Sequence, residues 1–378
     1  MEKLHPGEAC SMSNFKGRVG LAQRVLPRYR ASFFDMLAER CTGGFSVIAG
    51  QPRPGEAIGT TTELREAKYS PARNIHLLSG PLYFCWQRGL LAWLRTWDPQ
   101  VLIVEANPRY LSTPHAVNWM KQRNRPVIGW GLGAPRLRDG LAGLRQARRQ
   151  RFLSQFDALI AYSQRGENEY RRLGFPADRI FVAPNAVAPR PQAEAPKRNV
   201  KFVTPATVLF VGRLQARKGI DSLLRAAAGL PKELQPGLQI VGEGPARLEL
   251  EDLAAEVYPA AEFTGALYGP ALEVLFAAAD LFVLPGTGGL AIQQALAYGL
   301  PIIVAEGDGS QEDMVSSVNG WLLPIGDEAA LRAALAEALS DGERLRQMGA
   351  ASFRLAQERF NLEAMVQGFV TALNEVTK

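Results

Sequence analysis

The feature that most constrains the fold is an alternation of strand and helix patterns that runs through the sequence twice. Short apolar runs such as VLIVEA (101–106) and TVLFVG (207–212) each precede a segment whose apolar residues recur at helical spacing. Strands that alternate with helices pair in parallel, because right-handed crossovers return the chain to the same sheet. The sequence therefore predicts an α/β protein with two doubly wound parallel-sheet domains. Ligands of such domains bind at the carboxyl ends of the strands, here in a cleft between the two domains.

The same patterns predict the order of the elements. We expect strands at 17–26, 45–50, 74–78, 101–106, 126–133, 156–163, 180–187, 207–212, 237–242, 261–265, 280–286, 301–306 and 321–325. We expect helices at 33–41, 114–124, 165–174, 219–230, 245–257, 270–279 and 291–299, and one long helix at 351–376.

A break in this rhythm predicts the domain boundary. The segment APRPQAEAPKRN (188–199) has three prolines, several charges and almost no large apolar residue, which is typical of an exposed linker. We therefore predict an N-terminal domain at 1–190 and a C-terminal domain at 191–360. A C-terminal helix at 361–378 is expected to cross back to the first domain.

Composition excludes several classes of protein. No apolar run reaches the roughly 18 residues that span a bilayer, and residues 1–15 lack the apolar core of a signal peptide, so we expect a cytoplasmic protein. The three cysteines and three histidines are scattered, which argues against a disulfide framework or a metal site. Residues 1–190 hold 28 Lys and Arg against 14 Asp and Glu, whereas residues 191–378 hold 15 against 23. The basic first half predicts an acidic partner, such as a membrane surface or a phosphorylated lipid.

The strongest chemical motif is VLFVGRLQARKGID (208–221). An apolar strand ends at Gly212, and Arg213 and Lys218 follow in the loop before a helix. A helix N-terminus attracts anions, and two added cations make such a turn a candidate diphosphate site. The alternative is a solvated basic loop.

Eight further segments extend this motif into a family resemblance. The second half carries GRLQARKG, IVGEGP (240–245), FTG (263–265), AAADLFVLPG (277–286) and GLAIQQALAYGLPIIVAE (289–306), and the first half carries LPRYRASFFDMLAE (26–39), IVEANPRY (103–110), VIGWGLG (127–133) and IAYSQRGENEYRRLGFPADRIFVAPNAV (160–187). In this order they resemble glycosyltransferase family 4, of the GT-B fold, and its polysaccharide-building members in particular. The resemblance covers nearly the whole chain. It implies that the domain at 1–190 binds the acceptor and that the domain at 191–360 binds the nucleotide sugar.

The resemblance implies sugar transfer from a nucleotide-diphosphate sugar, with retention of configuration and without an essential metal or other cofactor. Arg213 and Lys218 match the pair that holds the donor diphosphate. Other expected donor-binding residues are Gly212, Thr287, Gly288, Gly289, Leu290, Gln294, Leu267 and Glu312. Among them, Leu267 follows FTG, where the family holds the nucleotide base.

The chain departs from the family at two positions. The family pattern has two glutamates, the first contacting the transferred sugar and the second the ribose, and here they are Gly286 and Gln294. An amide still hydrogen-bonds ribose. Glycine supplies no side chain, so we expect the backbone amides of residues 287–289 to form an anion nest in its place. The nearest approach to an Asp-x-Asp motif is Glu306-Gly-Asp308, which is as consistent with an exposed acidic turn.

The first half supplies the expected acceptor site. Arg28, Tyr29 and Arg30 follow the first strand, and Asn107 and Arg109 follow a strand on the same rim. Charged acceptors such as a lipid diphosphate suit these side chains, although a packed tyrosine between solvated arginines explains them as well. Glu105 is the candidate for orienting an acceptor hydroxyl or acting as a base.

The basic run RLRDGLAGLRQARRQRF (136–152) is the candidate contact with anionic lipid, with a solvated helix face as the alternative. Nucleic acid is not expected as a partner, because no series of stacking aromatics or known reading module is present. The sequence thus predicts a glycosyltransferase (EC 2.4) with a UDP- or GDP-sugar donor and a glycan or lipid-linked acceptor, acting in the cytoplasm and peripherally on the inner membrane face. The missing glutamates leave open a non-catalytic sugar-nucleotide-binding protein of the same fold. A sugar-nucleotide epimerase of this fold would need acid–base side chains near the diphosphate, and the sequence offers no convincing set.

Overall fold

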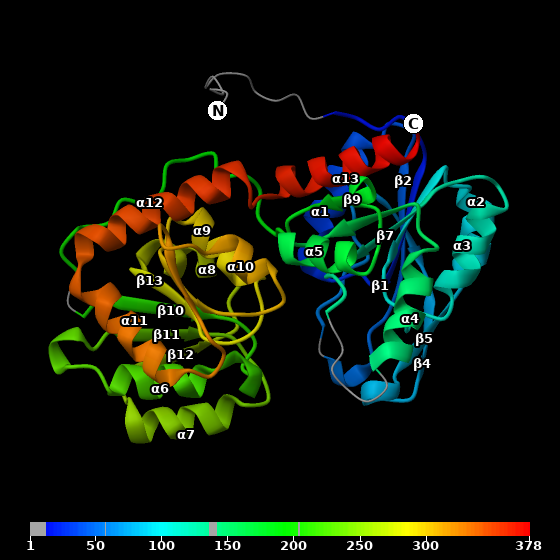
Figure 1. Cartoon of the computed structure of the whole chain (residues 1–378). Helices are drawn as coiled ribbons and strands as arrows, with labels where there is room; N and C mark the ends of the chain where they lie inside the picture. The colour runs from blue at the N-terminus through cyan, green and yellow to red at the C-terminus, as the bar shows by residue number, and fades with distance from the viewer. Residues whose placement is uncertain (1–12, 57, 136–141, 203–204) are drawn as a thin grey trace. The chain divides into compact units, whose positions relative to one another are not determined.

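The protein is described by a computed structural model that covers residues 13–56, 58–135, 142–202 and 205–378. It divides into two compact units (Figure 1). Unit 1 comprises Met1–Ala161, Gly166–Ala183 and Met365–Lys378, and unit 2 comprises Tyr162–Arg165 and Pro184–Ala364.

Unit 1 is built on a seven-stranded parallel sheet with the order β3-β2-β1-β6-β7-β8-β9. Its strands are β1 (Val19–Val25), β2 (Phe45–Gly50), β3 (Lys68–Pro71), β6 (Val101–Glu105), β7 (Val127–Gly131), β8 (Ala158–Ala161) and β9 (Ile180–Val182). Its helices are α1 (Ala31–Arg40), α2 (Leu90–Trp97), α3 (Thr113–Lys121), α4 (Ala142–Leu153), and most of α5 (Gln164–Arg172) and of α13 (Leu362–Val376). Strands β2, β6 and β8 are mostly apolar and are buried except at Glu105, the last residue of β6, because helices cover both faces of the sheet.

Two apolar layers flank this sheet. Leu102, Val104 and Leu159 point toward α2–α5 and share a buried cluster with Trp93 and Tyr170. On the other face, Phe33 of α1, Trp130 of β7 and Phe369 of α13 form an aromatic cluster, with ring centroids 4.9–5.8 Å apart. The last helix of the chain therefore completes the core of the first unit.

Unit 2 repeats the architecture with a six-stranded parallel sheet in the order β12-β11-β10-β13-β14-β15. Its strands are β10 (Thr207–Val211), β11 (Gly237–Val241), β12 (Ala261–Gly265), β13 (Leu281–Leu284), β14 (Ile302–Ala305) and β15 (Gly320–Leu323). Its helices are α6 (Ile220–Ala228), α7 (Arg247–Val257), α8 (Pro270–Ala278), α9 (Leu290–Ala297), α10 (Ser310–Met314), α11 (Glu328–Ser340) and α12 (Gly342–Glu358). Figure 1 shows α6 and α7 on one face of this sheet and α8, α9 and α12 on the other.

The predicted α/β class and the two doubly wound parallel sheets are confirmed. Two expected elements differ. The segment expected as a strand at 74–78 forms β4 (Arg73–Leu77) in an antiparallel hairpin with β5 (Phe84–Arg88), outside the main sheet. Its exposed and half-buried residues alternate, which is typical of a hairpin with one covered face.

The single long helix expected at 351–376 is the second difference, because the chain breaks between α12 and α13. Asn361 explains the break. Its side-chain amide donates to the carbonyl oxygens of Ala356 and Gln357, at 2.7 and 3.0 Å, and its Oδ1 accepts the N–H of Ala364 at 2.8 Å. One buried asparagine thus ends the first helix and caps the second.

Candidate functional site

Two loops of unit 2 meet because the strands before them are neighbours. β10 and β13 pair in parallel, so the loop after β10, at 212–219, and the glycine loop after β13, at 285–289, leave the same edge of the sheet. The first loop reaches the second through hydrogen bonds. Arg217 donates from Nη1 to the hydroxyl oxygen of Thr287 at 3.0 Å, and the N–H of Thr287 donates to the carbonyl of Arg217 at 3.1 Å.

Lys218 lies in the middle of this contact. Its side chain is only 8% exposed, and its Nζ donates to the carbonyl oxygen of Thr287 at 2.6 Å. Burial, together with the neighbouring Arg217, lowers the pKa of Lys218 to about 8, although Asp308 opposes the shift. A Cβ at position 288 would overlap the Lys218 ammonium, and Gly288 has a φ of +125°. Only glycine leaves room for the lysine here.

The backbone N–H groups of the glycine loop have different partners. Those of Thr287 and Gly288 are used inside unit 2, the first by Arg217 and the second by Oε1 of Gln311 at 3.1 Å. In the described part of the chain, the N–H groups of Gly289 and Leu290 have no hydrogen-bond acceptor, and they stand at the N-terminus of α9. The expected nest of three amides is therefore reduced in this structure to a helix N-terminus next to a buried ammonium.

Arg213 and Gly212 follow β10 directly. The N–H of Gly212 donates to Val241 at the end of β11, and Leu214 donates to Glu243 in the loop that follows β11. A Cβ at position 242 would lie 2.9 Å from the carbonyl carbon of Gly212. The loop after β11 therefore packs against the loop after β10 only because residue 242 is glycine. Arg213 is partly buried on this platform.

The other expected donor-binding residues lie on further elements of unit 2, and Gln294 faces a cavity to which neither loop contributes a lining residue. Oε1 of Glu312 accepts from Arg165 at 2.9 Å and from the N–H of Gly307 at 3.2 Å, and its Oε2 is buried with no hydrogen-bond partner within the described ranges. Gln294 lines a cavity of about 510 Å³ between α8, α9 and the segment that includes Ala188 and Pro196. Leu267 is half-buried against the core of unit 2.

Asp308 precedes the short helix α10 and contacts its first residue, Ser310. Its Oδ1 accepts from the N–H of Ser310 at 3.1 Å and from the hydroxyl of the same residue. Within the Glu306-Gly-Asp308 segment, Asp308 therefore has a structural contact of its own. Among the described residues, no cluster of three or more His, Cys, Asp and Glu side chains could hold a metal ion.

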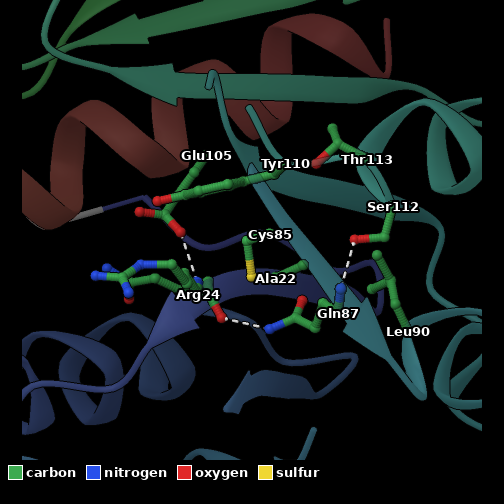
Figure 2. Close-up of a pocket in the computed structure, with 10 residues that line it drawn as sticks. Ala22, Arg24, Cys85, Gln87, Leu90, Glu105, Tyr110, Ser112 and Thr113 are labelled. Atoms are coloured by element: carbon green, nitrogen blue, oxygen red, sulfur yellow. Dashed lines mark hydrogen bonds between the residues drawn. The ribbon is translucent and has the colours of Figure 1, made fainter. Parts of the chain in front are cut away.

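Glu105 lies at the carboxyl end of β6 in unit 1, and Figure 2 shows it facing Arg24 and Tyr110 across a small cavity. Its Oε2 accepts the N–H of Arg24 at 2.5 Å. Burial raises the pKa of Glu105 to about 7, against the opposing effect of that hydrogen bond and of the charges of Arg24 and Arg30. The cavity holds about 10 Å³, room for about one water molecule. A carboxyl group with this pKa is able to exchange a proton near neutral pH.

The Arg-Tyr-Arg segment after β1 does not have the tyrosine packed between two solvated arginines: the tyrosine is exposed and the second arginine is buried. Arg28 is exposed and Tyr29 is 48% exposed, whereas Arg30 is buried. The guanidinium carbon of Arg30 lies 5.2 Å from the ring centroid of Trp130. Arg30 therefore joins the aromatic layer of unit 1.

Asn107 and Arg109 lie just beyond β6. Asn107 is half-buried and accepts the N–H of Arg109 at 3.1 Å, while the Arg109 side chain is exposed. The basic run at 136–152 is described only from residue 142 onward, so its first six residues fall outside the described residues. In the remainder, Arg145 and Arg148 are exposed on α4, and Phe152 is buried. In the described part of the chain, no helix is long and apolar enough to cross a membrane.

Sequence reasoning missed three residues, two that contact the glycine loop of unit 2 and one that contacts Glu105 within unit 1. Gln311 and Arg217 fasten the glycine loop of unit 2, and Arg24 links Glu105 to Glu56 of unit 1, with which its guanidinium makes an ion pair of 2.8 Å. No local pattern marks Gln311 as buried. Arg217 stands beside Lys218 and could have been found from that position.

Comparison with known proteins places both units in one family. Residues 44–186 match the family model "Glycosyl transferase 4-like domain", and residues 191–354 match "Glycosyl transferases group 1". A GDP-mannose-dependent alpha-mannosyltransferase of Corynebacterium glutamicum is 39% identical over 153 residues. That segment is 40% of this chain and 35% of the relative, so the match spans about a third of the relative's length.

Solved structures share the fold over nearly the whole chain. Sucrose-phosphate synthase from Thermosynechococcus elongatus has a TM-score of 0.69 at 20% identity, covering 95% of this chain and 98% of that one. Anabaena HepE, solved with UDP-glucose, has a TM-score of 0.61 at 16% identity, covering 96% and 98%. The two family models together match most of the chain, the first over most of the sheet of unit 1 and the second over the sheet of unit 2. The chain belongs to glycosyltransferase family 4, with the GT-B fold.

Proposed function

We propose that this protein transfers a sugar from a nucleotide-diphosphate sugar to a glycan or lipid-linked acceptor, with retention of configuration and without a metal ion. One observation carries the proposal. A buried lysine of the loop after β10, Lys218, donates to the glycine loop at Thr287, and the N–H groups of Gly289 and Leu290 that follow in that loop have no acceptor in the described part of the chain. Such an arrangement favours binding of a diphosphate.

The chemistry follows from the charge that develops on the leaving group. The bond between the anomeric carbon and the diphosphate oxygen breaks, and the acceptor oxygen bonds to the same carbon. The diphosphate departs with increased negative charge and takes up the proton of the acceptor hydroxyl. Lys218, Arg213 and the N–H groups of Gly289 and Leu290 stabilise this charge, which is commonly the largest single contribution of such a site. Protein cations thus take the place of a metal.

The remaining donor contacts are assigned by position. The amide of Gln294 has a donor and an acceptor for the ribose hydroxyls, and Leu267 offers an apolar surface to the base. Oε2 of Glu312 is buried and has no hydrogen-bond partner within the described ranges, and we assign it as the acceptor of a hydrogen bond from a hydroxyl of the transferred sugar. The mannosyltransferase relative uses GDP-mannose by its name, and HepE was solved with UDP-glucose, so we propose a GDP- or UDP-sugar as donor.

Unit 1 is proposed to bind the acceptor. Glu105 orients the acceptor hydroxyl, and the exposed Arg28, Tyr29 and Arg109 contact the rest of the acceptor, with Asn107 and the buried Arg30 supporting them. The positive charge of residues 1–190 suits an anionic acceptor or an anionic membrane surface. We therefore propose that the protein acts in the cytoplasm, on the inner face of the membrane.

A donor panel tests this function. The full-length protein is incubated with UDP- and GDP-sugars, with and without EDTA, and sugar release is followed by chromatography, with the anomer identified by NMR. We expect slow hydrolysis of at least one donor, an α-anomer first product from an α-linked donor, and the same rate in EDTA. Tight binding of nucleotides with no turnover of any donor would contradict the proposal and favour a sugar-nucleotide-binding protein. A rate abolished by EDTA and restored by Mg²⁺ would contradict metal independence.

A further inference from the structure

The glycine loop of unit 2 cannot be fastened by a side chain of its own at position 286. A Cβ there would lie 2.5 Å from the carbonyl carbon of Lys218 and 2.6 Å from its Cα, and it would overlap the carbonyl oxygen of Arg217. Real Cβ atoms do not approach backbone so closely. The backbone of the loop after β10 therefore occupies the space that any larger residue at 286 would need.

Gln311 of α10 fastens the loop instead. Its side chain has no exposed surface. Its Oε1 accepts the N–H of Gly288 at 3.1 Å, and its Nε2 donates to the carbonyls of Gly286 and Ala305, at 3.1 and 2.7 Å. One amide thus ties the glycine loop to the end of β14.

The partners of this amide fix its orientation. A flipped amide would place its NH₂ group against the N–H of Gly288 and its oxygen against two carbonyl oxygens. A third glycine closes the space around it, since a Cβ at position 307 would lie 2.5 Å from Cδ of Gln311. The Gln311 side chain has therefore one conformation available in this packing.

The position of the loop also decides where Lys218 lies. The Lys218 ammonium donates to the carbonyl of Thr287, one residue from each of the two loop residues that Gln311 holds. The free N–H groups of Gly289 and Leu290 follow directly in the chain. A shift of the loop would move the ammonium and these N–H groups together.

We propose that Gln311 is a positioning residue for catalysis, which holds the glycine loop so that Lys218 and the N-terminus of α9 converge on the donor diphosphate. It does so from α10, at a place where position 286 has no side chain to offer. The inference rests on the proposed function, since it concerns the same diphosphate site. Gln311 itself contacts the loop and not the reacting atoms.

The test compares Gln311→Met with a matched control, Gln293→Met. Gln293 is also fully buried in unit 2, and its amide also makes three backbone hydrogen bonds, with Val187, Ala188 and Phe360. Both variants lose a buried amide of the same size, and only one of them releases the glycine loop. Thermal unfolding, affinity for the nucleoside diphosphate and steady-state kinetics with the preferred donor are measured for both.

We expect similar losses of thermal stability in the two variants. Only Gln311→Met should lose at least tenfold in kcat and several-fold in affinity for the nucleoside diphosphate, with little change in KM for the acceptor. The pH midpoint of diphosphate binding should also rise toward the ordinary lysine value in Gln311→Met alone, because a loosened loop leaves Lys218 better solvated. The proposal would be overturned if Gln311→Met behaved like Gln293→Met. That means kcat and affinity within about twofold and a pH midpoint within about 0.2 pH units, which is on the order of measurement error.

The outcomes separate this proposal from the proposed function. An active wild-type protein with an unaffected Gln311→Met variant overturns the role of Gln311 alone. A wild-type protein that binds nucleoside diphosphate without turnover contradicts the transferase, and the affinity ratio of the two variants then decides the role of Gln311. A wild-type protein that binds no nucleoside diphosphate overturns both. If Gln311→Met does not fold, Gly307→Ala displaces the same amide and replaces it in each comparison.

Discussion

The chemistry proposed for unit 2 depends on a single buried lysine whose charge is costly to keep. Lys218 has one hydrogen-bond acceptor, the carbonyl of Thr287, and its positively charged neighbour Arg217 disfavours a second charge. An arriving diphosphate would supply the missing negative charge. A bound diphosphate would therefore offset the electrostatic cost of keeping the Lys218 charge buried.

The pKa of about 8 makes this idea testable by pH. Below pH 8 Lys218 is protonated in the free protein, so affinity for a nucleoside diphosphate should be constant, and above pH 8 it should fall by up to about tenfold per pH unit. Isothermal titration calorimetry between pH 6.5 and 9.5 measures this profile. The Lys218→Met variant should bind weakly and without this pH dependence, and Lys218→Ala should lose more than about tenfold in turnover.

The matched control for Lys218 is Lys232→Met, since Lys232 is exposed on the same unit. It should leave the profile unchanged. Stability should follow the opposite trend from binding. The folded state binds fewer protons than the unfolded chain between pH 8 and 10.5, so the free energy of unfolding should rise with pH across that window. A wild-type affinity that stays level up to pH 9.5 would contradict the assignment of Lys218 to the diphosphate.

At the scale of the element, the glycine loop and α9 form one continuous segment that the neighbouring elements hold in place. The loop after β10 fills the space beside Gly286, and α10 supplies Gln311. Backbone packing thus closes position 286, where the resemblance leads us to expect a glutamate. We therefore expect that a glutamate cannot be introduced at position 286 by one substitution without moving the neighbouring loop.

Gly286→Glu tests this directly. We expect a loss of thermal stability, because a Cβ at 286 forces the Arg217–Lys218 backbone to move, and we expect turnover to fall rather than rise. Differential scanning fluorimetry and the donor assay give the two readouts. Gly237→Ala is the control in the same unit, since its Cβ would meet nothing closer than 3.9 Å. A Gly286→Glu variant with wild-type stability and increased turnover would show that the loop moves freely and that the glutamate was lost without structural cause.

At the scale of the whole molecule, the charge of the chain is divided between its halves. Residues 1–190 carry a surplus of basic side chains, and residues 191–378 carry a surplus of acidic ones. On α4, Arg145 and Arg148 are exposed, and Leu144 is 73% exposed beside them. A basic helix with an exposed leucine suits the surface of an anionic membrane.

Vesicle sedimentation tests this surface. We expect the full-length protein to bind vesicles that contain phosphatidylglycerol and not vesicles of phosphatidylcholine alone, with binding that weakens as salt rises. The double variant Arg145→Ser, Arg148→Ser should bind several-fold less. The pair Arg332→Ser, Arg354→Ser removes the same charge from exposed positions of unit 2 and should bind like the wild type. Equal binding by the two double variants would contradict a specific role for α4.

Much of the fold could be predicted from the sequence, because buried parallel strands are continuous apolar runs and the helices between them have apolar residues at every third or fourth position. The hairpin at Arg73–Arg88 escaped this reasoning because its strands are short and partly exposed. The break after α12 escaped it because apolar spacing continues through Asn361, whose capping role depends on where its amide points. Both misses concern positions where a few polar contacts outweigh the apolar pattern.

For the candidate site, the sequence by itself determined which residue types stand after which strands, and so it placed Arg213, Lys218 and the glycine loop at strand ends. Only the tertiary structure decided what those residues do to one another. It closed position 286 with the backbone of a neighbouring loop, used two of the expected amides internally, and brought Gln311 under the loop from 23 to 25 residues further along the chain. The physical reason is that strand patterns depend on local spacing, whereas the burial of a charge and the satisfaction of each N–H depend on side chains that only packing brings together.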